Sequence, residues 1–259
     1  LGWNKSQNTE VLKFLHSKKV KHLEYSPSRL SNFHEDKTNK QILYYYRKKN
    51  FCLLSAQSLL FGYKNSFIFG SKIQRENFSR NLKNSLKKIK CFKTKIVIFG
   101  SPANKKSFDK GKSILDKIAL KEFKKISQIC KKFKIVFCLE ANPKIYNCDY
   151  LIQTRDALRI VKQINSNYFK INLDIGTIIA NKEHLQFLNK KNIKYIGHVQ
   201  ISVPYLKSIL SKKLYLKKIF IVIKLLKKLK YQKNISLETL NLSTRELKKN
   251  INYILKLIY

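Results

Sequence analysis

The sequence lacks the apolar stretches of a membrane protein and the glycine motifs of a nucleotide-binding fold. Its longest strongly apolar stretch, residues 219–226, is interrupted by Lys224 and is far shorter than the ~20 residues that a membrane-spanning helix needs. No signal-peptide pattern is present, and neither G-x-G-x-x-G nor G-x-x-x-x-G-K-S/T occurs. We therefore expect a cytoplasmic protein that does not associate with membranes.

Cysteine is scarce and methionine is absent. The five cysteines are odd in number and form no C-x-x-C pair, and Cys52 and Cys138 fall within expected strands. This pattern favours buried free thiols in a reducing compartment over disulfides or a zinc knuckle. The lack of methionine, even at position 1, indicates an N-terminus that is incomplete or processed.

Acidic residues are few: 15 Asp and Glu stand against 55 Lys and Arg, which gives a formal net charge of +40. Such a charge attracts nucleic acids, anionic membranes and phosphorylated small molecules. The lysines are, however, spread along the outward faces of almost every expected helix, and asparagine and isoleucine are abundant with them. This distribution is typical of compositional drift, so we expect no specific nucleic-acid partner.

Short apolar stretches alternate with longer amphipathic stretches along the whole chain. They predict eight strands, the first of them cut short, and eight helices. The expected strands are residues 1–4, 21–27, 51–57, 95–102, 135–140, 168–174, 195–202 and 234–240. The expected helices are residues 8–16, 39–49, 76–90, 111–132, 150–164, 182–190, 204–230 and 243–259.

This alternation predicts a parallel sheet whose strands are joined through helices. Eight such units in 259 residues favour closure into a (β/α)8 TIM barrel over an open doubly wound sheet. No Pro/Gly-rich linker divides the chain. We therefore predict an α/β protein with one domain, residues 1–259, and leave open whether it forms a homo-oligomer.

Four side chains of the kinds that bind metals lie at or near the ends of successive expected strands: Glu140, Asp174, His198 and Glu238. The carboxyl ends of parallel barrel strands meet at one rim, so these side chains are expected to converge there. A set of three carboxylates and an imidazole suits one divalent ion, Mn²⁺, Mg²⁺, Co²⁺ or Zn²⁺. The alternative is that each group separately caps a helix or pairs with one of the many lysines.

Motifs along nearly the whole chain resemble the sugar phosphate isomerase/epimerase superfamily, the xylose-isomerase-like TIM barrels that also include endonuclease IV. The resemblance implies that Glu140, Asp174, His198 and Glu238 are the metal ligands. It also implies that Glu140 and Glu238 exchange protons with the substrate carbon, as in the ketose epimerases of that superfamily. The motifs that carry it are W-N (residues 3–4), S-A-Q-S-L-L-F-G (55–62), F-G-S-P (99–102), L-E-A-N-P (139–143), N-L-D-I-G-T (172–177), G-H-V-Q-I-S (197–202) and I-S-L-E-T (235–239).

The implied chemistry is physically coherent. A divalent ion bound to a sugar carbonyl and the neighbouring hydroxyl acidifies the C–H between them and stabilises the enediolate. Glutamates on opposite sides of that carbon can remove the proton from one face and return it to the other. We therefore expect a metal-dependent isomerase or epimerase that acts on a sugar or sugar phosphate.

Several alternatives stay open at this point. The same enediolate can expel a β-hydroxyl, as in a dehydratase or lyase. The net charge leaves room for a basic nucleic-acid-binding protein similar to endonuclease IV, and the drifted composition leaves room for a barrel without catalysis. Hydrogen exchange at a sugar carbon would favour the isomerase or epimerase. Salt-dependent DNA affinity with cleavage at abasic sites would favour the endonuclease.

The other polar residues at the expected rim have weaker assignments. Gln57, Asn142 and Gln200 are expected to hydrogen-bond sugar hydroxyls, although each is equally suited to satisfy loop backbone. Glu24, at the end of an expected strand, either faces the pocket or forms a structural ion pair.

The chain also departs from the superfamily pattern. Thr177 stands where many epimerases and the endonucleases have histidine, and Gln200 replaces the second histidine of an H-x-H motif. Tyr146 stands where the epimerases have a substrate-binding glutamate, and no arginine follows His198 at the usual spacing. These departures leave the identity of the sugar open and disfavour a three-zinc endonuclease cluster.

Overall fold

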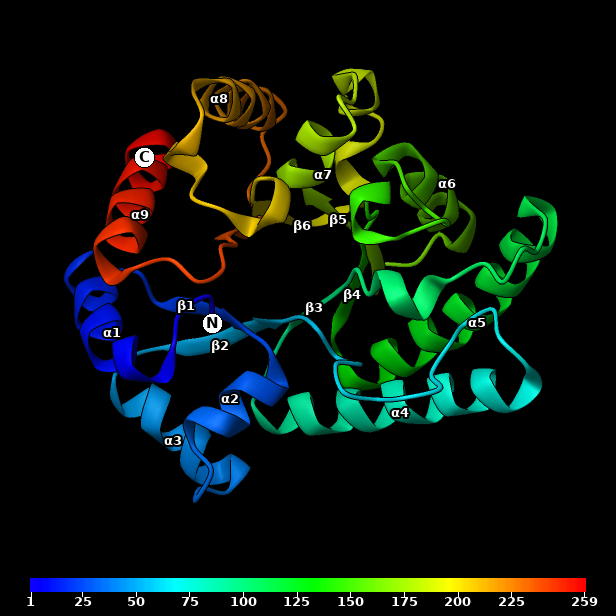
Figure 1. Cartoon of the computed structure of the whole chain (residues 1–259), viewed down its shortest axis with the longest axis horizontal. Helices are drawn as coiled ribbons and strands as arrows, with labels where there is room; N and C mark the ends of the chain where they lie inside the picture. The colour runs from blue at the N-terminus through cyan, green and yellow to red at the C-terminus, as the bar shows by residue number, and fades with distance from the viewer.

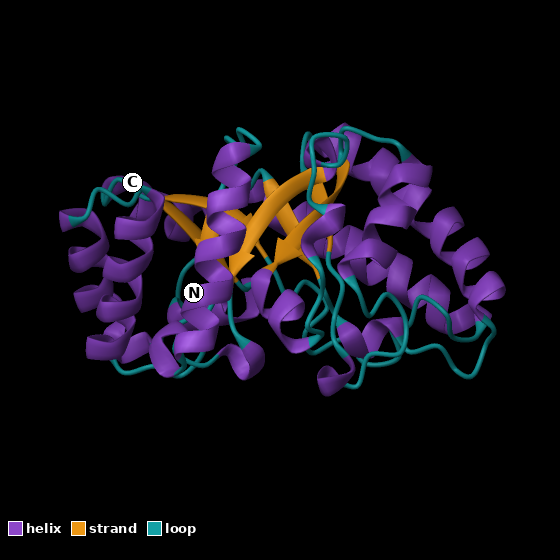
Figure 2. Cartoon of the chain, turned by 90° about the horizontal axis from the view of Figure 1, so that it is seen from above, coloured by secondary structure: helices purple, strands orange, loops and turns teal.

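The computed structural model describes residues 1–259, and its centre is one sheet of seven strands that pair in chain order. Every neighbouring pair is parallel, and the helices lie around the outside of the curved sheet (Figure 1; Figure 2). The strands are β1 (His22–Tyr25), β2 (Cys52–Ala56), β3 (Ile96–Phe99), β4 (Val136–Leu139), β5 (Phe169–Asp174), β6 (Ile196–Ile201) and β7 (Ile235–Leu237).

Nine α-helices connect and cover these strands. No helix combines the length and the apolar character that a membrane crossing requires. The helices are α1 (Asn8–Ser17), α2 (Pro27–Phe33), α3 (Asn39–Lys48), α4 (Lys72–Cys91), α5 (Lys112–Phe133), α6 (Thr154–Ile164), α7 (Ile175–Ala180), α8 (Lys213–Lys228) and α9 (Thr244–Ile258).

The predicted TIM barrel is confirmed, but with seven strands in place of eight. The expected strand at residues 1–4 is not one: the segment runs between β1 and β7 without forming a ladder with either. The ammonium group of Leu1 donates to the carbonyl of Glu24 at 2.9 Å. A Cβ added to Gly2 would lie 2.6 Å from the carbonyl oxygen of Thr239. Residues 1–4 therefore fill the gap between β1 and β7 through one hydrogen bond and one close backbone approach. The barrel is nearly closed at this point.

The helix predictions were right for most of the chain and wrong in three places. Residues 182–190 form only a short 3₁₀ turn, Leu185–Phe187, whereas the helix of this unit is α7, directly after β5. The long helix expected from residue 204 begins only at Lys213, because two 3₁₀ turns, Pro204–Leu206 and Ile209–Ser211, come first. Helix α2 was not predicted, although Pro27 is a favourable first helical residue.

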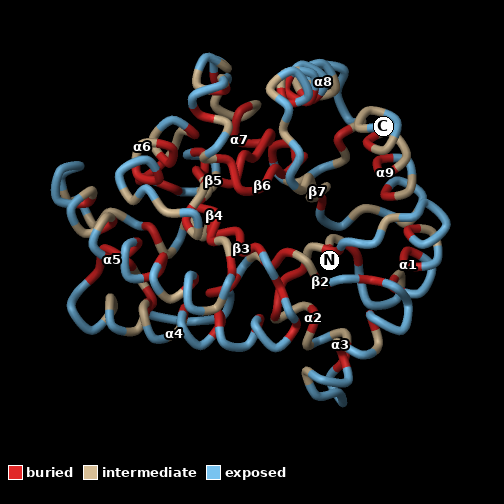
Figure 3. The backbone as a smooth tube through the Cα atoms, turned by 180° about the vertical axis from the view of Figure 1, so that it is seen from behind, coloured by how far each residue is buried: buried red, intermediate tan, exposed pale blue.

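The main core lies between the sheet and the helices, where 57 buried hydrophobic residues form one cluster (Figure 3). A second cluster of three residues, Ile96, Ile98 and Cys138, lies apart from it. Buried polar residues meet inside the barrel: Gln200 of β6 and Ser55 of β2 both donate to Glu24 of β1, and Asn172 of β5 donates to Gln200. The inside of the barrel therefore has a polar network, while the apolar core holds the helices to its outside.

Candidate functional site

A cavity of about 510 Å³ opens at the carboxyl ends of the strands. Glu140, Asp174 and Glu238 all line it, as do Gln57 and Asn142. We call it the carboxylate cavity. The structure thus brings three of the four predicted metal ligands and two of the three predicted substrate-binding residues to one place.

Glu140 follows the last residue of β4, and two amides hold its carboxylate. Asn142 Nδ2 donates to Oε1 at 2.8 Å, and Asn172 Nδ2 donates to Oε2 at 2.7 Å. The side chain lies across the end of β3, where a Cβ on Gly100 would be 2.6 Å from Oε1. Glycine at position 100 therefore makes room for the carboxylate. Burial, together with the charge of Asp174, raises the pKa of Glu140 to about 8.

Lys105 lies directly behind Glu140 and is completely buried, with 0% of its surface exposed. Its Nζ donates to the backbone carbonyl of Glu140 and to Asn142 Oδ1, both at 2.8 Å. Burial lowers its pKa, while the nearby Cys148 and Glu140 act in the opposite direction. A buried ammonium group is costly unless it is paired. Lys105 therefore fixes the strand end and the amide that together position Glu140.

Asp174 ends β5 and caps helix α7. Its Oδ1 accepts hydrogen bonds from Gly176 N at 3.1 Å and from Ser202 Oγ at 2.5 Å. Its Oδ2 accepts from the N–H and the hydroxyl of Thr177, both at 2.9 Å. The Thr177 hydroxyl also lies 3.0 Å from the carbonyl oxygen of Ala141. Three donors are therefore committed to Asp174 and the fourth is shared, against about four lone-pair sites of a carboxylate. Burial nevertheless leaves the pKa of Asp174 above its usual value.

Glu238, one residue beyond β7, has fewer partners. Burial and the charges of Glu140 and Asp174 raise its pKa well above the usual value, against a hydrogen bond from Gln57. Like charges this close cannot all ionise easily. The three carboxylates of the cavity therefore retain a proton under conditions in which isolated carboxylates would have lost theirs.

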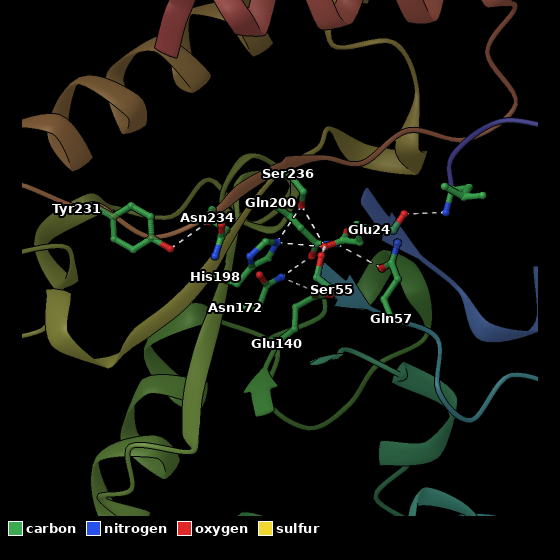
Figure 4. Close-up of polar contacts among 11 residues, drawn as sticks. Glu24, Ser55, Gln57, Glu140, Asn172, His198, Gln200, Tyr231, Asn234 and Ser236 are labelled. Carbon is green, nitrogen blue, oxygen red and sulfur yellow. Dashed lines mark hydrogen bonds and ion pairs between the residues drawn. The ribbon is translucent and has the colours of Figure 1, made fainter. Parts of the chain in front are cut away.

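His198 is on β6, but it does not line the carboxylate cavity. Its Nε2 lies 3.0 Å from Glu24 Oε2 and 2.9 Å from Ser236 Oγ, and its side chain is 1% exposed. Its Nδ1 is buried without a hydrogen-bond partner. Figure 4 shows this imidazole turned towards Glu24 inside the barrel. His198 and Glu24 instead border a second cavity, of about 620 Å³, at the opening between β1 and β7.

Glu24 is therefore paired with His198 in a buried hydrogen-bond network, and it does not line the carboxylate cavity. Besides His198, its carboxylate accepts hydrogen bonds from Gln200 Nε2 at 2.7 Å, Ser55 Oγ at 2.9 Å and Ser236 Oγ at 3.1 Å (Figure 4). Burial alone would raise the pKa of Glu24, but the hydrogen bond and charge of His198, with the other donors, hold it below the usual value.

A family model, the xylose isomerase-like TIM barrel, matches residues 14–257, which is nearly the whole chain. The chain belongs to the xylose isomerase-like TIM barrel family. No curated protein matches it by sequence.

Solved structures of similar shape show that this fold is shared, and at 14% identity they show the fold alone. A 3-keto-D-glucoside 4-epimerase from E. coli aligns over 99% of this chain and 97% of its own, with a TM-score of 0.76. The zinc-bound IOLI protein aligns over 96% and 92%, also at 0.76. A D-psicose 3-epimerase from Clostridium cellulolyticum H10, solved with D-tagatose, aligns over 97% and 92%, with a TM-score of 0.72.

For this member of the xylose isomerase-like family, the four predicted metal ligands do not form one set. No three His, Cys, Asp or Glu side chains lie close enough together to hold an ion. The lone pairs of Asp174 are engaged in capping α7, and His198 Nε2 faces Glu24. Glu140, with two amide donors, and Glu238, with a hydrogen bond from Gln57, keep more lone pairs free at the cavity than Asp174 does. Three carboxylates at one cavity, Glu140, Asp174 and Glu238, thus offer the oxygen donors that suit a divalent ion, and His198 lies outside that cavity.

Gln200, the third predicted substrate-binding residue, does not reach the carboxylate cavity. It is fully buried, and its amide links Asn172, Glu24 and Gln57. The resemblance to the xylose isomerase-like family missed Asn172 and Lys105. Asn172 had a usable signal, because it is two residues before Asp174 and therefore on the same face of β5. Nothing in the sequence distinguished Lys105 from the many other lysines.

Proposed function

We propose that this chain is a sugar isomerase or epimerase in which Glu140 and Glu238 exchange protons with a carbon next to the sugar carbonyl. One observation carries the proposal: three buried carboxylates line the same cavity. Burial and the charges of neighbouring carboxylates raise the pKa of Glu140 to about 8 and that of Glu238 well above its usual value, so the cluster holds a proton near neutral pH. A protonated and an ionised carboxyl group facing one ligand are the acid and the base that an isomerisation needs. Membership of the xylose isomerase-like TIM barrel family supports this proposal.

The surrounding residues have distinct tasks in this proposal. The amides of Asn142 and Asn172 hold Glu140 by N–H groups, which leaves its remaining lone pairs free to accept the substrate proton. Gln57 and Asn142 line the cavity and offer amide groups to sugar hydroxyls. Lys105 keeps Glu140 and Asn142 in place from behind.

A divalent ion, if bound, would take Glu140 and Glu238 as ligands and polarise the sugar carbonyl. Asp174 would join only by giving up part of its cap on α7, and His198 only by moving into the cavity, which it does not line.

The test is deuterium uptake from D₂O into a panel of ketoses and aldoses, followed by NMR, with and without added Mn²⁺. We expect uptake at the carbon next to the carbonyl. Glu140→Gln and Glu238→Gln should each slow it by about 10²- to 10⁴-fold, because each removes one proton-transferring group. The control Glu76→Gln, an exposed glutamate of α4, should leave the rate unchanged. If no sugar takes up deuterium even with Mn²⁺, the proposal is wrong; loss of a β-hydroxyl in the same spectra would identify a dehydratase.

Nucleic-acid binding is a second candidate because of the net charge of +40. A DNA affinity that falls steeply with salt and is equal for all sequences would be explained by this charge alone. Cleavage at abasic sites that is lost in Glu140→Gln would favour an endonuclease over the isomerase.

A further inference from the structure

The charge of the carboxylate cavity is opposite to that of the protein. Of the 55 lysines and arginines, only Lys64 lines it, against the three carboxylates of Glu140, Asp174 and Glu238. Lys105, behind the wall, already donates to Glu140 and Asn142. No arginine lines the cavity to form bidentate hydrogen bonds with a phosphate. A phosphate monoester, which carries close to two negative charges at neutral pH, therefore finds repulsion and a single exposed lysine.

The mouth of the same cavity is aromatic. Phe61 and Tyr63, on the loop between β2 and α4, both line the cavity and are exposed, Phe61 at 76%. Tyr146, after β4, also lines it, and the exposed Tyr205, after β6, packs edge-on against Tyr146 with ring centroids 6.2 Å apart. We call Phe61, Tyr63, Tyr146 and Tyr205 the aromatic rim. Exposed aromatic groups that gather at one cavity mark a surface that binds an apolar or flat ligand face.

Floor and rim therefore have different chemistry. The floor has carboxylates and amides, which suit the hydroxyls and carbonyl of one sugar unit. The rim offers ring faces, which carry negative charge density and attract the C–H groups along a sugar ring. The rim thus adds a second contact surface, of different chemistry, to the same cavity.

We propose that the site takes an unphosphorylated ketose that carries a second sugar unit, with the ketose at the carboxylates and the second unit on the aromatic rim. The inference rests on the proposed function for the reaction at the floor, and it adds the class of substrate. It selects the neutral sugar from the two classes, sugar and sugar phosphate, that the sequence left open.

The test measures binding of three probes to the full chain: D-fructose, D-fructose 6-phosphate and lactulose, a disaccharide with a free ketose unit. Titration calorimetry in about 1 M salt, where the screening length is about 3 Å, suppresses unspecific attraction to the basic surface. Lactulose should bind about two- to tenfold more tightly than fructose, as expected for one or two aromatic contacts. The phosphate should bind no more tightly than fructose.

Variants assign the difference to the rim. Phe61→Ala and Tyr63→Ala should remove the advantage of lactulose over fructose, while Phe220→Ala, a 49% exposed residue of α8, should keep it. Equal affinity for lactulose and fructose, tighter binding of the phosphate with its loss in Lys64→Ala, or no binding of any probe would each overturn the inference. Deuterium uptake is read separately: lactulose binding without uptake overturns only the proposed function, and uptake into fructose with equal affinities overturns only the substrate class.

Discussion

Two groups of buried carboxylates in this barrel have opposite properties. Glu24, inside the barrel, has four partners and a lowered pKa, whereas Glu140 and Glu238, in the carboxylate cavity, have amide partners, negative neighbours and raised pKa values. All three are glutamates in or next to parallel strands, so residue type and strand position do not explain the difference. The partners do: Glu24 faces an imidazole and two hydroxyls, and the others face one another across a cavity. A carboxylate with a full set of partners stabilises the fold, and one without them is available to a ligand.

The largest expected effect comes from removing the paired carboxylate. Glu24→Ala should lower the free energy of unfolding by about 3–5 kcal/mol, because it leaves His198 and the amide of Gln200 buried without their partner. Glu238→Gln at the cavity should be neutral or stabilising, since it removes repulsion. Urea denaturation followed by circular dichroism measures both. Similar losses in the two variants would contradict the distinction between the two groups.

A second, smaller effect separates the two groups by pH. The pKa of Glu140 is raised in the folded state, so the folded protein binds more protons than the unfolded chain above about pH 4.5 and becomes less stable until pH passes about 8. The free energy of unfolding of Glu140→Gln should therefore rise relative to the parent by about 1–3 kcal/mol between pH 5 and pH 8. The lowered pKa of Glu24 has the opposite sign, and its contribution is lost only as pH falls below the range of free glutamate.

The matched measurement is urea denaturation of parent, Glu140→Gln and Glu76→Gln at pH 5 and pH 8. Glu76 is exposed on α4, so its variant should follow the parent at both pH values. A constant difference between Glu140→Gln and the parent would show that Glu140 ionises normally.

The smallest effect tests how the hydrogen bonds to Glu24 share its stabilisation. Ser55→Ala removes one donor at 2.9 Å and leaves the other three partners in place. We expect a loss of about 1 kcal/mol, as for one hydrogen bond in a network. Ser113→Ala, at an exposed position near the start of α5, serves as the control with no expected change. A loss as large as that of Glu24→Ala would mean that Ser55, and not His198, secures the carboxylate.

The sequence predicted the strands from β1 to β7 and the positions of Glu140, Asp174 and Glu238 at one rim, since buried parallel strands require continuous apolar runs. The prediction of a strand at residues 1–4 was wrong. Apolar residues favour a strand, but a strand also needs neighbouring strands with which its backbone can form hydrogen bonds. It also left open whether Asp174 caps a helix, and the structure shows that it does.

The partners of these groups were decided only by the tertiary structure. Gln200 and Glu24 are 176 residues apart in the sequence, and Lys105 and Glu140 are 35 apart, so no local pattern links them. The period of the apolar residues determined which side chains point into the barrel and in which order the strands follow. Barrel closure then determined which of them meet, because strands that are distant in sequence become opposite walls of one interior. For this reason the sequence by itself determined the fold and the rim, and only the structure decided that His198 pairs with Glu24 while the glutamates in the carboxylate cavity stay open to a ligand.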